Sequence, residues 1–408
     1  MKIPDYQRPY KWKAKNVNQL IDDILFHKDK QGYRLGTLVL HKDDENNFNI
    51  VDGQQRVITI FLLAHGLNSH KLNDSNKINF SNLCLPNNII SQNNIKSNYG
   101  MIERLIEEFD NTNIEFFLNK CQLVKVVIDD VQEAFQFFDS QNARGKDLEP
   151  HDLLKAFHLR EMNKSTEEEK IKVVEEWENL ESKELTNLFA NYLFKIKNWS
   201  KGNSAYYFTK NDIDIFKGVN LETQNYPFIK QLQINNYYVD KQNEAERVNN
   251  YHFDYPFQID QIVINGKRFF EMVIYYNNLV KDINKLKETF KKDAYEYDIL
   301  NTLDTYKGHN RSGDRYVRNM FNCALVYYID KFAKIDLDRA IKKLFIWAYN
   351  LRFKLYSVKL VSVDNYASDE KSIFRKIYYA VNHNEILLLN INSVKEIKRE
   401  IKEFEKFI

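Results

Sequence analysis

The segment from Ile50 to Arg56 combines an Asp, a Gly, two amides and an Arg between a β-rich run and an almost wholly apolar helical pattern. These residue types suit a site that holds a phosphate. Gly53 lets the backbone turn sharply, and the first free N–H groups of the following helix favour an anion. Arg56 would add a charged fork, and Asp52 could hold a metal ion or orient a water molecule. The residues alone equally allow a capped helix start with Arg56 in an ion pair.

A second segment, residues 3–12, places Gln7 and Arg8 among tyrosines and prolines. One interpretation is an edge strand in which Arg8 stacks between Tyr6 and Tyr10. The other is that Gln7 and Arg8 line the same pocket as Arg56. Both interpretations remain open on the residues.

A third segment follows at residues 138–156, where Asn142 and Arg144 precede Gly145 and Asp152 begins a helical pattern. A Gly-containing loop with an Asx-type cap explains these residues as well as a direct ligand role does.

Together and in this order, the three segments resemble the N-terminal domain of the GmrSD-type modification-dependent restriction endonucleases. The resemblance is strong over residues 1–160 and weaker through 257–261 and 313–318. It implies a ParB/sulfiredoxin-like α+β fold with the Asp-Gly-Gln-Gln-Arg motif at a nucleotide or phosphate site. The residues that carry it are Pro4, Tyr6, Gln7, Arg8, Tyr10, Trp12, Asp52, Gly53, Gln54, Gln55, Arg56, Phe138, Asn142, Arg144, Gly145, Leu148, Asp152, Leu153, Leu154, Lys155 and Ala156.

The resemblance implies binding and hydrolysis of a nucleoside triphosphate with Mg²⁺ at Asp52, linked to restriction of foreign and often modified DNA. Its catalytic residues would be Asp52, Gln54, Gln55 and Arg56, with a glutamine orienting the attacking water. Phosphate ligands would be Gln7, Arg8, Gly53, Arg56, Asn142 and Arg144. We expect Arg8, Asp52, Gln55 and Arg56 to converge on one cavity. The alternative is a non-catalytic module that grips DNA phosphate while a separate nuclease cuts.

Length and charge limit where DNA could bind. At 408 residues the chain exceeds one typical domain. Its 59 basic residues face 57 acidic ones, which leaves a net charge of +2, so any DNA contact must use a local patch. The best patch surrounds Arg311, Arg315 and Arg318. A solvated helix face is the other interpretation. A nuclease partner or a second copy of the chain are the further partners we expect.

The sequence lacks the motifs of several other classes of protein. Three widely separated cysteines without a CxxC spacing argue against a disulfide framework and fit a reducing cytoplasm. No apolar run approaches the ~20 residues of a membrane span. A phosphate-binding P-loop, an HExxH zinc site and a GxSxG elbow are missing. The triplet at residues 383–385 is predicted to be a turn rather than part of a His-Asn-His nuclease.

Periodicity predicts an α+β domain over residues 1–162 and a mainly helical domain over 163–408. The polar stretch at 68–97 is predicted to be a loop or insertion. A capping box at Ser393 predicts a terminal amphipathic helix. The other predicted elements are strands at 33–41, 48–52 and 122–128, the first two forming a hairpin, and helices at 16–27, 54–67, 99–110, 131–141 and 151–162.

Overall fold

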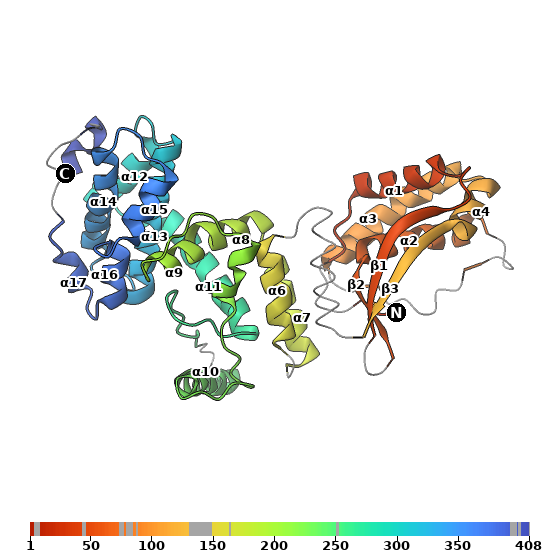
Figure 1. Cartoon of the computed structure of the whole chain (residues 1–408), viewed down its shortest axis with the longest axis horizontal. Coiled ribbons are helices and arrows are strands. Elements are labelled where there is room, and N and C mark those ends of the chain that lie inside the picture. The colour runs from red at the N-terminus through yellow and green to blue at the C-terminus, as the bar shows by residue number, and fades with distance from the viewer. Residues whose placement is uncertain are drawn as a thin grey trace. The chain divides into compact units, whose positions relative to one another are not determined.

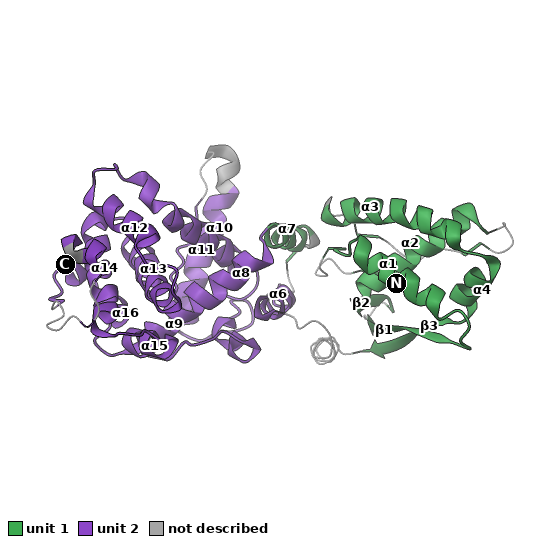
Figure 2. Ribbon diagram, turned by 90° about the horizontal axis from the view of Figure 1, so that it is seen from above, with its two compact units in different colours: residues 1–148, 165–179 green, residues 149–164, 180–408 purple. Residues whose placement is uncertain are grey.

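The computed structural model describes residues 1–3, 9–42, 46–72, 77–78, 85–86, 89–129, 149–162, 165–249, 253–391, 398 and 401–407. The chain forms two compact units (Figure 2). The N-terminal unit comprises residues 1–148 and 165–179, and the C-terminal unit comprises residues 149–164 and 180–408. The chain therefore passes between the units three times.

A small mixed sheet organises the N-terminal unit (Figure 1). In the described part its order is β2-β1-β3, with β1 at Tyr33–Lys42, β2 at Phe48–Asp52 and β3 at Cys121–Ile128. β1 pairs antiparallel with β2 and parallel with β3, and Lys2 adds a parallel bridge to Asn49. The predicted strands and their hairpin are confirmed, because β-branched runs flank a polar turn composition.

Four helices pack with this sheet, and α2 is the most deeply buried of them. Leu62 and Leu63 lie in the main apolar core, while Val57 packs on Leu38 and Ile50 of the sheet. An apolar residue on nearly every face predicts such burial, and the predicted helix at 54–67 is confirmed. The bounds are α1 at Ala14–Phe26, α2 at Gln54–His70, α3 at Ile89–Leu105 and α4 at Asn111–Asn119.

The prediction of a loop over residues 68–97 is wrong at both ends of that segment, whereas the described residues 71–72, 77–78 and 85–86 lie outside helices and strands. α2 continues to His70, and α3 already begins at Ile89. The polar residues of α3 include Ser91 and Asn98, which are buried and used in hydrogen bonds inside the unit. Polar composition therefore does not mean exposure here. The predicted helix at 131–141 lies outside the described residues.

Helix α7, at Glu167–Glu178, completes the N-terminal unit although it follows α6, at Pro150–Arg160, in the chain. A capping box between Thr166 and Glu169 starts it, and Trp177 is buried. Glu178 forms an ion pair with Lys11 at 2.6 Å. The predicted domain boundary at 162 falls between these two helices.

Helix α6, at Pro150–Arg160, belongs to the C-terminal unit. Its His158 is fully buried, accepts a hydrogen bond from Gly266 N at Nδ1 (3.3 Å) and stacks on Phe269 with ring centroids 3.6 Å apart. Burial lowers the pKa of His158, so the neutral ring donates from Nε2 to the Phe216 carbonyl, 3.2 Å away. These contacts fix α6 to the helices that follow.

The C-terminal unit is mainly helical (Figure 1), so the predicted fold class is confirmed. Its centre is α13, whose residues from Phe321 to Tyr328 are nearly all buried. No helix in the described part is long and apolar enough to cross a membrane. The helices are α8 at Ser182–Leu188, α9 at Phe194–Trp199, α10 at Ile229–Asn249, α11 at Lys267–Asn284, α12 at Tyr295–Thr305, α13 at Ser312–Phe332, α14 at Leu337–Lys354, α15 at Leu360–Ser368, α16 at Ile373–Tyr379 and α17 at Asn384–Leu387.

The chain's C-terminal end differs from its prediction. Half of the predicted amphipathic helix lies outside the described residues, and most of the described part is a 3-10 helix at Lys402–Phe407, η6. Its apolar residues are nevertheless buried as the periodicity indicated. Phe404 packs on Tyr306 and Tyr349.

Candidate functional site

The turn between β2 and α2 requires glycine. Gly53 has a φ of +93°, in the left-handed region, and a Cβ there would lie 2.9 Å from the Thr37 carbonyl oxygen. α2 begins at the next residue, and the Val57 N–H already bonds to the Gly53 carbonyl. The free N–H groups of this first turn thus lie directly after Asp52, at the positive end of the helix dipole.

Arg56 lies against β1 and has no counter-charge among the described residues. Its guanidinium covers Gly36, where a Cβ would be 2.5 Å from Nη1, and this Gly has a φ of +136° beside a register shift in the β1–β3 pairing. Nη1 donates one long hydrogen bond, 3.4 Å, to the Thr37 carbonyl. Across the described residues no carboxylate pairs with Arg56, so the ion-pair interpretation has no support there.

Asp52 and Gln54 add two further polar groups for which the described residues provide no partner. The Asp52 side chain makes no capping bond to α2 and joins no ion pair within the described part of the chain. Gln54 is only 3% exposed, yet its Oε1 has no hydrogen-bond partner among the described residues. A buried polar atom without a partner costs roughly 1–3 kcal/mol, so its presence calls for an explanation.

Gln55 has a different role from Gln54. Its Oε1 accepts hydrogen bonds from the N–H groups of Lys11 (2.8 Å) and Trp12 (3.2 Å). Its Nε2 donates to the Pro9 carbonyl at 3.1 Å. The amide therefore bonds to three backbone groups and holds the opening segment against α2. While these bonds last, Gln54 Oε1 and not Gln55 Oε1 is the acceptor without a partner among the described residues.

Helix α3 also holds this opening segment. Tyr10 is fully buried; its N–H donates to Ser91, and its hydroxyl bonds to Thr59 at 2.8 Å. Asn94 donates to the Tyr10 carbonyl, and Asn98 donates to both the Tyr10 hydroxyl and the Trp12 carbonyl. The backbone just after Gln7 and Arg8 is thus anchored beside the motif.

Four predicted ligands cannot be placed. Gln7, Arg8, Asn142 and Arg144 lie outside the described residues. The sequence interpretation missed Ser91, Asn94 and Asn98, whose helical spacing was the available signal.

Within the described residues, only part of the predicted basic patch is free of ion pairs. Arg311 and Arg315 are exposed at the start of α13 and form no ion pair within the described residues. Arg318 instead pairs with Asp304 at 2.8 Å. Burial of this carboxyl works against ionisation, but Arg318 and Lys287 outweigh it and lower the pKa of Asp304. The positive charge available to a DNA backbone is therefore smaller than the sequence indicated.

Two family models match the chain, one over its N-terminal part and one over its C-terminal part. Residues 1–159 match the family described as the GmrSD restriction endonuclease N-terminal domain, which confirms the resemblance of the opening segments. Residues 169–406, more than half of the chain, match a family of unknown function, DUF7834. The chain belongs to the DUF7834 family. No curated protein matches it. The N-terminal domain is of the restriction type, which suggests a defence protein that acts on DNA.

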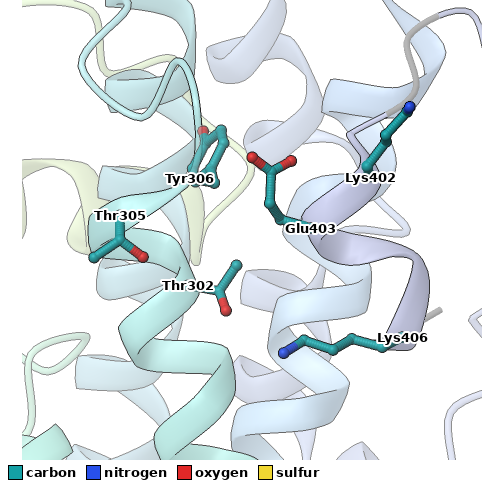
Figure 3. A pocket seen from close by; sticks show the side chains of 6 residues that line it. All are labelled: Thr302, Thr305, Tyr306, Lys402, Glu403 and Lys406. Carbon is teal, nitrogen blue, oxygen red and sulfur yellow. The ribbon is translucent and has the colours of Figure 1, made fainter.

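The DUF7834 segment contains a shallow cavity of about 600 Å³ that the sequence did not predict (Figure 3). It lies between α12 and η6. Glu403 accepts a hydrogen bond from the Lys307 N–H at 3.1 Å, and Lys406 pairs with Asp298. The charges of Glu403 and Lys406 in the cavity lining are thus partly compensated by their partners. The lining residues are Thr302, Thr305, Tyr306, Lys402, Glu403 and Lys406.

Side chains that could bind a metal ion together are scarce in the described residues of both family-matched segments. Among those residues no three His, Cys, Asp or Glu side chains gather closely enough to hold a metal ion. His383 bonds to Asp336 at 3.0 Å and precedes the short helix α17.

Proposed function

We propose that this DUF7834 protein is a restriction-type defence protein that binds and hydrolyses a nucleoside triphosphate at the amino end of α2. The single observation that carries the proposal is the group of unpartnered polar side chains there. Within the described residues, Asp52 and Arg56 lack ion pairs and Gln54 Oε1 lacks a donor. Structural residues normally satisfy one another, so such a group suits a ligand.

The phosphates would lie against Gly53 and the first N–H groups of α2. Arg56 would bind phosphate oxygens and offset the charge that develops during transfer. Asp52 would position the attacking water, and Gln54 would accept a hydrogen bond from that water. On the family resemblance, Gln7, Arg8, Asn142 and Arg144 are proposed as further phosphate ligands.

A single carboxylate such as Asp52 fits a Mg²⁺ ion that arrives with its nucleotide, because this ion typically takes one or two carboxylates and completes its shell with phosphate and water. The ion would neutralise charge on the phosphates. Turnover would be coupled to recognition of DNA, as the restriction-type domain suggests.

The test is nucleotide hydrolysis by the full chain with and without Mg²⁺. We expect Arg56→Ala and Asp52→Ala each to reduce turnover by on the order of 10²-fold, the usual loss when one charge-stabilising group is removed. Arg34→Ala is the matched control, since Arg34 is exposed on β1 and should leave turnover unchanged. Equal rates for Arg56→Ala and Arg34→Ala would contradict the assignment.

A second candidate is a DNA-phosphate grip that serves a separate nuclease. The geometry of the turn favours it too, since Gly53, the first N–H groups of α2 and Arg56 would hold a DNA phosphate by the same contacts as a nucleotide phosphate. Here the wild-type chain would bind DNA but no nucleotide, and Arg56→Ala would weaken DNA binding. Binding of a nucleotide by wild type, lost in Arg56→Ala, excludes this candidate.

A further inference from the structure

One face of α10 is firmly attached to the C-terminal unit. Val239 is buried in an apolar cluster on that face. Arg268 of α11, itself only 6% exposed, donates to Asn236 at 2.7 Å and pairs with Asp240. These contacts all lie on one side, so the helix is held in place with its opposite side uncovered (Figure 1).

The uncovered side carries a regular stripe of large apolar and charged residues. Ile234 is 67% exposed and Tyr237 is 65% exposed, with Tyr238 at the border of the stripe. Spacing of three and four residues keeps the stripe within less than a quarter of the helix circumference. From one end to the other it consists of Lys230, Ile234, Tyr237, Lys241 and Glu244, all exposed.

Such a stripe is unusual for a surface without a partner. Contiguous exposed apolar side chains on a soluble protein commonly mark an interaction site. Ile234, Tyr237 and Tyr238, with the lysine stems, offer on the order of 500 Å² to a partner, since an aromatic side chain alone can bury 150–250 Å². Two such faces would bury roughly 1,000 Å², the lower range of specific association.

The charges of the stripe distinguish between partners. Two lysines and one glutamate leave it nearly balanced, which suits a polyanion such as DNA poorly. Lys230 and Glu244 each stand seven positions from Tyr237, on opposite sides of it. An antiparallel copy of the same helix would therefore place each lysine opposite a glutamate, and the surface is complementary to itself.

We propose that α10 packs antiparallel against α10 of a second copy of this chain, about a twofold axis through Tyr237. The two Tyr237 rings meet at the axis, and Ile234 packs under the stem of Lys241 of the second copy. Within one chain Glu244 pairs with Lys241 at 2.6 Å, but this pair is exposed and stabilises little. Glu244 can therefore turn to Lys230 of the second copy.

Sedimentation velocity of the full chain over about 1–100 µM tests the association. Wild type should shift toward twice the chain mass as concentration rises, because an interface of this size gives a weak dimer. Tyr237→Glu should remain a monomer throughout. Tyr379→Glu is the control, since Tyr379 on α16 is 64% exposed and lies outside the stripe. A monomeric wild type at every concentration, or equal losses in both variants, would overturn the proposal.

Charge exchange then tests the antiparallel register. Lys230→Glu and Glu244→Lys should each raise the dimer dissociation constant at least about tenfold, because each places two like-charged pairs at the interface. The double exchange should restore it to within about threefold. Failure of the double variant to recover contradicts this register.

Oxidative cross-linking gives an independent measurement. Tyr237→Cys should form a disulfide-linked dimer across the axis, whereas Asn235→Cys, exposed on another side of α10, should not exceed the wild-type background. Equal cross-linking of the two variants contradicts the axis. If Tyr237→Glu weakens nucleic-acid binding while the mass stays unchanged, the occupant is nucleic acid and the dimer is wrong.

Discussion

The start of α2 and the centre of the C-terminal unit treat buried polar groups in opposite ways. In the C-terminal unit, Asp314 accepts hydrogen bonds from Arg352 Nε at 2.9 Å and from the Tyr306 hydroxyl at 2.8 Å, and both charged residues are 2% exposed. In the N-terminal unit, Arg56 has one long hydrogen bond to a carbonyl. Gln54 there has an acceptor with no donor in the described residues.

A second carboxylate of the C-terminal unit shows the same saturation. Asp364 accepts from the Trp199 indole N–H, from the Ser204 hydroxyl and from the Ala205 N–H, all within 2.8 Å. Such networks stabilise a fold and leave nothing for a ligand. At these places the degree of hydrogen-bond satisfaction, more than residue type or burial, separates structural polar residues from candidate functional ones. It does not separate the two units as wholes, because Asn277 Nδ2 and Arg318 Nε of the C-terminal unit also have no partner among the described residues.

The largest expected effect is on the buried ion pair. Arg352→Ala should lower the free energy of unfolding by roughly 3–5 kcal/mol, because it leaves Asp314 charged and buried without its partner. Arg339→Ala is the control, since its pair with Asp336 is exposed and 3.7 Å long, and it should cost less than about 0.5 kcal/mol. Urea denaturation measures both. Equal losses would show that the pair is not a structural network.

The next effect compares two adjacent glutamines. Gln55→Ala should lower the free energy of unfolding by roughly 1–3 kcal/mol, because the backbone groups of Pro9, Lys11 and Trp12 lose their partner. Gln54→Met should be nearly neutral for stability, since its amide oxygen has no bond to lose, yet it should reduce nucleotide turnover. Thermal unfolding and the hydrolysis assay separate the two residues. A large stability loss in Gln54→Met would place it with the structural residues.

The smallest effect, counted per pH unit, concerns a carboxyl between these extremes. Asp330 accepts from the Tyr276 hydroxyl and the Ile259 N–H, but burial raises its pKa from 3.8 to about 7. The folded state thus holds this proton more tightly, so its contribution is complete below pH 3.8 and is lost as pH rises through 7. The loss is at most ~1.4 kcal/mol per pH unit.

Asp330→Asn should flatten that slope, because the amide stays neutral throughout the range. Denaturant titrations of wild type and variant at pH 5, 6, 7 and 8 give the measurement. Parallel stability curves for the two proteins would contradict a raised pKa. Asp254→Asn, on an exposed carboxyl, is the control.

Local patterns predicted most of the N-terminal elements. The hairpin followed from alternating apolar residues around a polar turn, and α2 followed from its apolar faces. The start of α3 did not follow, because Asn94 and Asn98 serve the backbone of residues more than 80 positions earlier. A local pattern carries no information on partners so distant.

The motif at residues 52–56 also shows how little a local sequence pattern predicts about distant partners. A Gly at the turn follows from residue type, and Gly53 has the conformation that only such a residue adopts readily. The division between Gln54 and Gln55 does not follow, because it depends on where Pro9 to Trp12 return to α2. Nor does the pairing of Arg318 with Asp304, which lies in another helix.

The exchange of α6 and α7 between the units has a consequence for synthesis. The N-terminal unit remains incomplete until Glu178 and Trp177 have left the ribosome, so a chain cut at residue 162 would lack the partner of Lys11. Meanwhile α6 is already made, but the residues that enclose His158 appear only near Phe216 and Gly266. The nascent chain must therefore carry the apolar residues Leu154 and Leu159 of α6 uncovered until the second unit is made, a stage at which aggregation competes with folding.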